Sequence, residues 1–249
     1  MGTSLTREAV LRRLADEGVA TFTSREFRRW FPRSTRGVTY WWLGYLVDHG
    51  VLRRFLHGWY VVRGPAESEV LRDPMFLATR LADPSYVAFG SALHFHGWTE
   101  EAPGVTLVAS PRYSRIHRIG RHPVRVVHLP PRRFFGSAPA RHGSLEFAVA
   151  DPEKAIVDAF YLPRCCGGMR NVVAALGAAR PSLRLPRLQA YAVRMGSASL
   201  CSRLGYVLEH LGEEARALER HVSDGYVKLD SRGARKGRSS SRWHVIDNL

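Results

Sequence analysis

The stretch SREFRRWFPRSTRGVTYWWLGYLVDHG, residues 24–50, decides how the N-terminal part of this chain folds. We expect a helix with Ser24 as its N-cap, because serine is a preferred capping residue, and Pro32 stops it, because proline cannot continue a helix. A second helix is predicted over residues 35–49, with Ser34 as its cap and a glycine directly after its end. The stretch therefore predicts two consecutive helices joined by a short turn.

The residues on either side of this stretch complete a pattern. Leu5 to Glu17 predicts a helix, because its apolar residues recur at helical spacing on one side. The segment VLRRFLHGWYVV, residues 51–62, predicts two strands around a tight turn that contains glycine. Three helices followed by a hairpin are the order of a winged helix-turn-helix, which we expect over residues 1–64.

The second helix of the pair has one side suited to packing and one suited to a partner. At 100° per residue, the packing side is expected to hold Val38, Thr39, Trp42, Leu43 and Leu46. The opposite side then holds Gly37, Tyr40, Trp41, Gly44 and Asp48. Glycine lowers helix stability, so its presence here favours close approach to another surface. Trp41 alone fits the core equally well.

The start of this helix and the hairpin supply the predicted DNA contacts. Helix N-termini favour phosphate oxygens, and in helix-turn-helix proteins they point at base edges. Arg36 suits a bidentate contact to guanine, and Tyr40 a phosphate or a thymine methyl group. The candidate DNA-binding residues are Ser34, Thr35, Arg36, Gly37, Thr39, Tyr40, Arg53 and Arg54.

The charge balance favours a polyanionic partner. The 249 residues include 37 Lys and Arg against 22 Asp and Glu, a net charge of +15, and the excess is spread along the chain. An arginine-rich composition without functional meaning is the alternative. The three cysteines predict neither a disulfide framework nor a zinc site. We expect a cytoplasmic protein with no cofactor, metal or membrane span.

Residues 70–249 are expected to form a second, mixed α/β domain behind a linker at 65–69, which gives an α+β chain. Alternating patterns predict strands at 105–110, 124–129 and 144–150. Two groups of basic residues are candidate contacts to a toxin or nucleic acid, with solvated loops as the alternative. They are Arg112, Arg115 and Arg118 on a loop or hairpin tip, and Arg232, Arg235, Lys236, Arg238 and Arg242 in a mobile connection near the C-terminus.

The segment DPEKAIVDAFYLPRCCGG, residues 151–168, predicts a helix with Asp151 as its N-cap. Asp151, Glu153 and Asp158 would be the metal ligands if the chain were a nucleic-acid-processing enzyme. No nucleophile or histidine converges on them in the sequence, so capping and solvation explain them better. We therefore expect no catalytic residues.

A short motif occurs twice, as LGYLVDHG at 43–50 and LGYVLEHLG at 204–212. The second copy belongs either to a second DNA-binding unit or to a helix with a similar packing pattern. The charged segment EEARALER after the second copy favours the packing pattern, because a wing would follow directly.

Three segments behind the predicted winged helix carry a family resemblance: VAFGSALHFHGW, VADPEKAIVDAFYLPRCCGG and RLQAYAVRMGSASLCSRLGYVLEHLG. Together they resemble the AbiEi-type antitoxins of bacterial abortive-infection systems over nearly the whole chain. The resemblance implies an autorepressor that binds inverted repeats in operator DNA, an arrangement compatible with paired monomers, and that counteracts a nucleotidyltransferase-like toxin. A winged-helix transcription factor with a ligand-sensing domain is the alternative.

Overall fold

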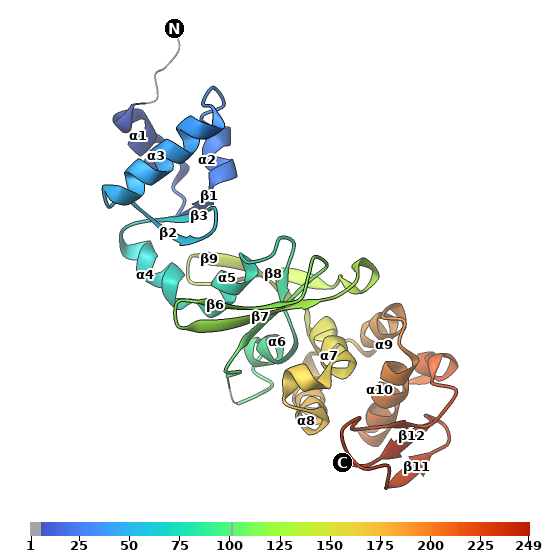
Figure 1. The fold of residues 1–249 in the computed structure, drawn as a ribbon. Coiled ribbons are helices and arrows are strands. Elements are labelled where there is room, and N and C mark those ends of the chain that lie inside the picture. Colours follow the sequence, from blue (N-terminus) through green and yellow to red (C-terminus); the bar gives the residue numbers. More distant parts are fainter. Residues whose placement is uncertain (1–5, 101) are drawn as a thin grey trace.

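The computed structural model describes residues 6–100 and 102–249 and shows an α+β chain with three separate sheets. A group of three helices and a small sheet forms the N-terminal end, a six-stranded sheet lies in the middle, and helices with a small sheet form the C-terminal end (Figure 1). Within the described residues, no helix has both the length and the apolar character needed to cross a membrane.

The N-terminal elements follow the expected order. They are α1 (Arg7–Glu17), β1 (Thr21–Thr23), α2 (Ser24–Trp30), α3 (Arg36–Asp48), β2 (Leu52–Leu56) and β3 (Trp59–Val62). The strands are antiparallel in the order β1-β3-β2. A hydrophobic core of their own holds them together, made of Val10, Leu14, Phe22, Phe27, Trp42, Leu43, Leu46, Leu52 and Tyr60. Leu5, the expected start of the first helix, lies outside the described residues.

Two predicted caps are wrong by one residue each. Thr23, not Ser24, caps α2: its hydroxyl accepts a hydrogen bond from the backbone of Glu26, whose carboxylate accepts one from the backbone of Thr23. Thr35, not Ser34, caps α3. The Ser34 hydroxyl instead donates to the Phe31 carbonyl at 2.7 Å and so closes the turn between the helices. In both places a neighbouring hydroxyl competed for the capping role.

The expected linker at 65–69 is an ordered helix, α4 (Pro65–Arg72). Glu67 pairs with Arg53 of β2 at 3.1 Å, and Glu69 accepts hydrogen bonds from Ser144 at 2.8 Å. The helix therefore contacts both the N-terminal hairpin and the loop that precedes β9. Figure 1 shows it at the junction of the two halves of the chain.

The central sheet has the order β6-β7-β5-β4-β9-β8. Its strands are β4 (Tyr86–Val87), β5 (Thr106–Ser110), β6 (Arg115–Ile119), β7 (His122–His128), β8 (Ser137–His142) and β9 (Leu145–Ala150). The predicted strands at 105–110, 124–129 and 144–150 are confirmed as β5, β7 and β9. The pairs β5–β7 and β4–β9 are parallel, whereas the other neighbouring pairs are antiparallel.

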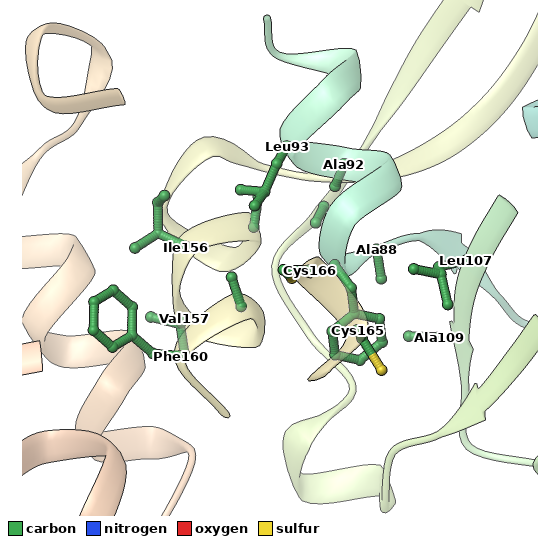
Figure 2. Packing of buried hydrophobic residues seen from close by; sticks show 14 of the residues in the cluster. Ala88, Ala92, Leu93, Leu107, Ala109, Ile156, Val157, Phe160, Cys165 and Cys166 are labelled. Carbon is green, nitrogen blue, oxygen red and sulfur yellow. The ribbon is translucent and has the colours of Figure 1, made fainter. Parts of the chain in front are cut away.

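Helices cover both faces of this sheet. In Figure 1, α5 (Pro74–Thr79) lies on one side and α6 (Phe89–Phe95) on the other. The remaining helical elements are η1 (Pro131–Arg133), α7 (Pro152–Tyr161), η2 (Pro163–Cys166), α8 (Met169–Ala179), η3 (Arg180–Ser182), α9 (Leu185–Arg194), α10 (Ala198–His210) and η4 (Arg216–His221). Part of the core between α6, α7, η2 and β5 is drawn in Figure 2, with side chains that include Leu93, Leu107, Ile156, Phe160 and Cys166.

A small sheet closes the C-terminal end in the order β10-β12-β11, made of β10 (Val227–Lys228), β11 (Arg238–Ser240) and β12 (Val245–Asp247). It packs on α10 and belongs to the same large hydrophobic core as the central sheet, through Leu229, Trp243 and Val245. The connection expected to be mobile therefore contains a strand.

Candidate nucleic-acid interface

A polar cleft of about 250 Å³ lies between α2 and α3, near the N-terminal end of each helix. The capping of α2 by Thr23 and of α3 by Thr35 fixes where the two helices begin. The residues that line this α2–α3 cleft are Ser24, Arg25, Arg28, Arg36, Thr39 and Tyr40. Three of the six carry a guanidinium group, so the cleft suits an anion.

The positive charge of the cleft affects the pKa of Tyr40. The Arg36 guanidinium lies 5.7 Å from the centre of the Tyr40 ring. Hydrogen bonding from Arg36, and then from Ser24, lowers the pKa of the Tyr40 phenol below its ordinary value, and Arg28 adds a smaller effect of the same sign. A site that favours the negative form of a phenol also favours a phosphate oxygen.

The outward face of α3 is open, as expected. Cβ atoms built at Gly37 and Gly44 would meet no heavy atom closer than 4.0 Å outside their own turn of helix. Trp42 is buried, but Trp41 is 60% exposed, which settles the alternatives for Trp41 in favour of the surface. The expectation that Val38 packs inward is wrong: the residue is 41% exposed, because it lies at the edge of the packing side of α3.

Thr39 and Ser34 are placed differently from the expectation that they contact DNA. Thr39 is 2% exposed, and its hydroxyl donates to the Thr35 carbonyl at 3.1 Å and lies 3.2 Å from the Ser34 hydroxyl. Thr39 is therefore an internal residue and no longer a candidate contact. The Ser34 hydroxyl is used in the turn, while Thr35, Arg36 and Gly37 are exposed.

The two arginines of the hairpin lie on opposite sides of β2. Arg53 pairs with Glu67 of α4, so its charge is partly neutralised. Arg54 is paired across the strands with Tyr60, and its charge opposes the rise that burial causes in the pKa of that phenol. Tyr40 also influences Tyr60 electrostatically. Of the two, Arg54 is the arginine that forms no ion pair among the described residues.

Sequence reasoning missed three residues of the cleft, Ser24, Arg25 and Arg28. Arg28 follows Ser24 by four residues and Arg25 by three on α2, so all three lie on one side of that helix. This spacing was visible in the sequence, but which side of α2 faces α3 depends on tertiary packing.

The middle arginine group does not form one surface. Arg112 donates from Nε to the Asp83 carbonyl at 2.8 Å. Arg115 and Arg118 lie in strand β6 of the β6–β7 hairpin, and Arg118 is one residue from the pair that closes its turn. Because side chains alternate along a strand, residues three apart point to opposite faces. That each of them contacts a toxin or nucleic acid stays a prediction.

The C-terminal basic group is brought together only in part. Arg242 is engaged inside the molecule, with ion pairs to Glu209 and Glu219. The connection itself is held in place because Asn248 donates to the carbonyls of Asp230 and Ala234, each at 2.9 Å. Four basic side chains remain exposed on it, those of Arg232, Arg235, Lys236 and Arg238.

The three carboxylates considered as metal ligands each have another partner. Asp151 caps α7 as predicted, by accepting from the Lys154 backbone at 2.9 Å, and Glu153 accepts from the Arg184 backbone at 2.9 Å. Asp158 is fully buried, not solvated, and forms an ion pair with Lys154. In the part of the chain that the structure describes, no group of three or more His, Cys, Asp or Glu side chains is arranged to hold a metal ion.

The buried pair is embedded in a larger set of contacts. Tyr86 donates to the second oxygen of Asp158 at 3.0 Å, and the Lys154 ammonium lies 4.7 Å from the centre of the Phe135 ring. Burial lowers the pKa of Lys154 and raises that of Asp158, and each partner counteracts the shift of the other. The missed signal was the i, i+4 spacing of the lysine and the aspartate.

A second hollow has a volume of about 800 Å³. It is the candidate ligand site under the alternative that the chain has a ligand-sensing domain. It lies beside α6, η2 and α8 and is lined largely by glycine and alanine, together with Trp98, Thr99, Glu100, Pro103, Asn171 and two buried cysteines, Cys165 and Cys166. Burial raises the pKa of both thiols, so neither is an activated nucleophile. The lining offers few polar side chains to orient a ligand.

Comparisons with known proteins define the fold and nothing finer. No family model and no curated protein matches the chain. Among solved structures, the chain is similar to the RV2827C protein from Mycobacterium tuberculosis, with 17% sequence identity and a TM-score of 0.61. The similarity covers 97% of this chain and 91% of that one. At this level of identity the likeness shows a shared fold.

Proposed function

We propose that the N-terminal unit is a winged helix-turn-helix that binds operator DNA. The observation that carries this proposal is the α2–α3 cleft, where Arg25, Arg28 and Arg36 converge beside the open, glycine-containing face of α3. Arginine is suited to phosphate and to guanine, and a face without large side chains allows close approach of a helix to a groove.

In the proposed complex, α3 enters the major groove and the β2–β3 hairpin acts as the wing. Arg25 and Arg28 of α2 contact phosphates at the edge of the groove, Arg36 contacts a base or the adjoining phosphate, and Arg54 extends the positive surface along the hairpin. In Figure 1 this hairpin lies between the three helices and the rest of the chain. The side chains of Tyr40 and Trp41 are exposed, so the outward face of α3 is not covered by other elements. In this proposal, two copies bind the two half-sites of an inverted repeat.

The test is operator binding by Arg36→Ala, with Arg170→Ala of α8 as a matched control. Both changes remove one exposed arginine, but only the first is in the cleft. We expect Arg36→Ala to weaken binding by about 1–3 kcal/mol at fixed salt, and Arg170→Ala to leave it nearly unchanged. Equal affinities for the two variants, measured by fluorescence anisotropy, would show that the cleft is not the contact.

We further propose that residues after α3 and the hairpin serve an antitoxin role, which rests on the sequence resemblance to AbiEi-type antitoxins. What supports it is that the N-terminal unit has a hydrophobic core distinct from that of the larger part of the chain, which leaves the larger part available for a separate task. In this proposal the protein acts in the cytoplasm by binding and not by turnover, and it counteracts a nucleotidyltransferase-like toxin.

Co-expression tests this second role without truncating the chain. A neighbouring nucleotidyltransferase-like toxin should be neutralised by the full-length protein and equally by its Arg36→Ala variant, although the variant represses the operon less. Loss of growth rescue in Arg36→Ala cells would mean that neutralisation depends on DNA binding. Absence of rescue by the wild-type protein would favour a transcription factor without a toxin.

A further inference from the structure

The outward surface of α3 combines two kinds of side chain on separate flanks. Counted at 100° per residue, Arg36 and Tyr40 lie on the flank next to the α2–α3 cleft. Val38, Trp41 and Tyr45 lie on the other flank, and Gly37 and Gly44 lie between the two flanks with open space above them.

The apolar flank is unusual for a surface. Two large hydrophobic residues are exposed on it, Val38 at 41% and Trp41 at 60%. Exposed apolar side chains that cluster in this way mark an interaction site, whereas single ones need no explanation.

Trp41 is held in a fixed orientation before any partner arrives. Its ring stacks on that of Tyr45, with centroids 5.5 Å apart and planes at 14°, and it meets Trp42 edge to face at 5.2 Å. A side chain that is already ordered loses little conformational entropy on binding. Gly37 and Gly44 leave the adjoining middle of the outward face open.

We infer that Trp41 determines operator specificity by packing against thymine 5-methyl groups in the major groove. This inference rests on the proposed DNA-binding function. The thymine methyl is the apolar group that base pairs present in the major groove, so it is the natural contact for an exposed indole face. The arginines of the other flank bind phosphate, and the two glycines let the helix come near enough for the indole to reach a base.

Charge favours DNA over a protein as the occupant of this surface. Arg25, Arg28 and Arg36 line the neighbouring cleft. A second copy of the chain would bring the same positive groups together and would be repelled, whereas a duplex neutralises them.

Thymine-to-deoxyuridine replacement tests the inference, because it removes the methyl group and nothing else. Duplexes are selected from a randomised pool with the full-length wild-type protein, and the strongest binder is resynthesised with deoxyuridine at each thymine in turn. We expect at least one replacement to weaken wild-type binding about fourfold, the effect of one buried methyl-sized group. Trp41→Ala should bind the thymine duplex correspondingly less well and be insensitive to that replacement, while Trp41→Phe keeps part of the sensitivity.

The control is Ile116→Ala, which removes an exposed apolar side chain, 72% exposed, from strand β6. It should bind like the wild type and keep the full deoxyuridine effect. If wild-type binding is strong but no thymine position responds, or if Trp41→Ala keeps the response, the inference is overturned and the DNA-binding proposal stands. If no duplex is selected, both fail. A change of oligomeric state in Trp41→Ala would assign the surface to a second copy and would also overturn the inference.

Discussion

Leu43-Gly44-Tyr45 in α3 and Leu204-Gly205-Tyr206 in α10 are the same tripeptide in two different surroundings. Both leucines are fully buried. In both helices the tyrosine ring contacts a histidine ring four residues later, at 3.8 Å between centroids in α3 and 4.1 Å in α10. The histidine Nδ1 also lies 2.8 or 2.9 Å from the tyrosine carbonyl. Local sequence has produced the same local structure twice.

The surroundings of the central glycine differ completely. A Cβ atom on Gly44 would meet nothing within 4 Å, whereas one on Gly205 would overlap the indole ring of Trp243. Trp243 is fully buried and donates from Nε1 to Glu209 at 2.7 Å, and the hydroxyl of Tyr206 donates to Asp247 at 2.9 Å. The C-terminal sheet thus occupies the face of α10 that α3 leaves open.

The comparison shows that a glycine on a helix has two separate uses. In α10 it makes room for an aromatic ring of the same chain, and in α3 it leaves a surface free. Of the two explanations for the second copy of the motif, a packing pattern is therefore the one that the structure supports, because no duplex can approach Gly205 while Trp243 lies against it. The motif alone does not indicate which use applies.

Removal of the Trp243 ring, which lies against Gly205 and has no counterpart at Gly44, should have the largest effect on stability. Trp243→Ala deletes a fully buried side chain and leaves a cavity over Gly205, so we expect a loss of about 3–5 kcal/mol in the free energy of unfolding. Trp41→Ala, the same substitution on the exposed face of α3, should change it by about 0.5 kcal/mol or less. Urea denaturation followed by circular dichroism measures both. Similar losses would mean that α3 is covered as α10 is.

Replacement of Gly205 by alanine should have the next largest effect on the free energy of unfolding. Gly205→Ala forces a methyl group into the Trp243 ring, and overpacking of this kind costs about 1–3 kcal/mol. The added methyl would meet the six-membered ring of the indole, so the shorter phenyl ring of Trp243→Phe should relieve the clash. We expect the double variant to be more stable than the sum of the two single changes predicts. Simple additivity in thermal unfolding would contradict the contact.

The elements of the N-terminal unit could be predicted because their signals are local. Helical periodicity, a proline and terminal glycines lie within or beside α1, α2 and α3 themselves. The caps were misplaced because Thr23 and Ser24, and Ser34 and Thr35, are adjacent hydroxyl residues, and sequence does not rank such neighbours. Strand β8 was missed because it is an exposed edge strand, so its sequence, SAPARH, has no buried face to produce alternation.

The candidate site could be predicted only where it depends on one helix. Arg36, Gly37 and Tyr40 follow from the phase of α3, whereas the contribution of Arg25 and Arg28 depends on how α2 packs against it. The prediction that Arg242 belongs to a free basic group in the C-terminal connection was wrong for the same reason. Its partners Glu209 and Glu219 are 33 and 23 residues away in the sequence. Pairing of charges over such distances is a property of the tertiary fold.

Replacement of each tyrosine of the repeated motif by phenylalanine should give a smaller difference in unfolding free energy. Tyr206→Phe removes the hydrogen bond to Asp247 and leaves its carboxylate with one partner fewer, which should cost about 0.5–1.5 kcal/mol. Tyr45→Phe changes a half-buried residue whose hydroxyl forms no hydrogen bond with the described residues, so we expect a smaller change in unfolding free energy. Chemical denaturation of the two variants side by side checks the difference, and a larger loss in Tyr45→Phe would be contrary to it.

Gly44→Ala should give a small change in stability, with the opposite sign to Gly205→Ala. Alanine is favoured over glycine in a helix interior by about 0.5–1 kcal/mol, and the space around Gly44 is open, so the variant should be more stable than the wild type. Its affinity for operator DNA should nevertheless fall, because the added methyl holds α3 away from the groove. Thermal unfolding and DNA binding measured on the same sample distinguish a glycine kept for a partner from one kept for packing. A variant that gained stability and bound DNA as well as the wild type would show that the open face of α3 does not approach the duplex closely.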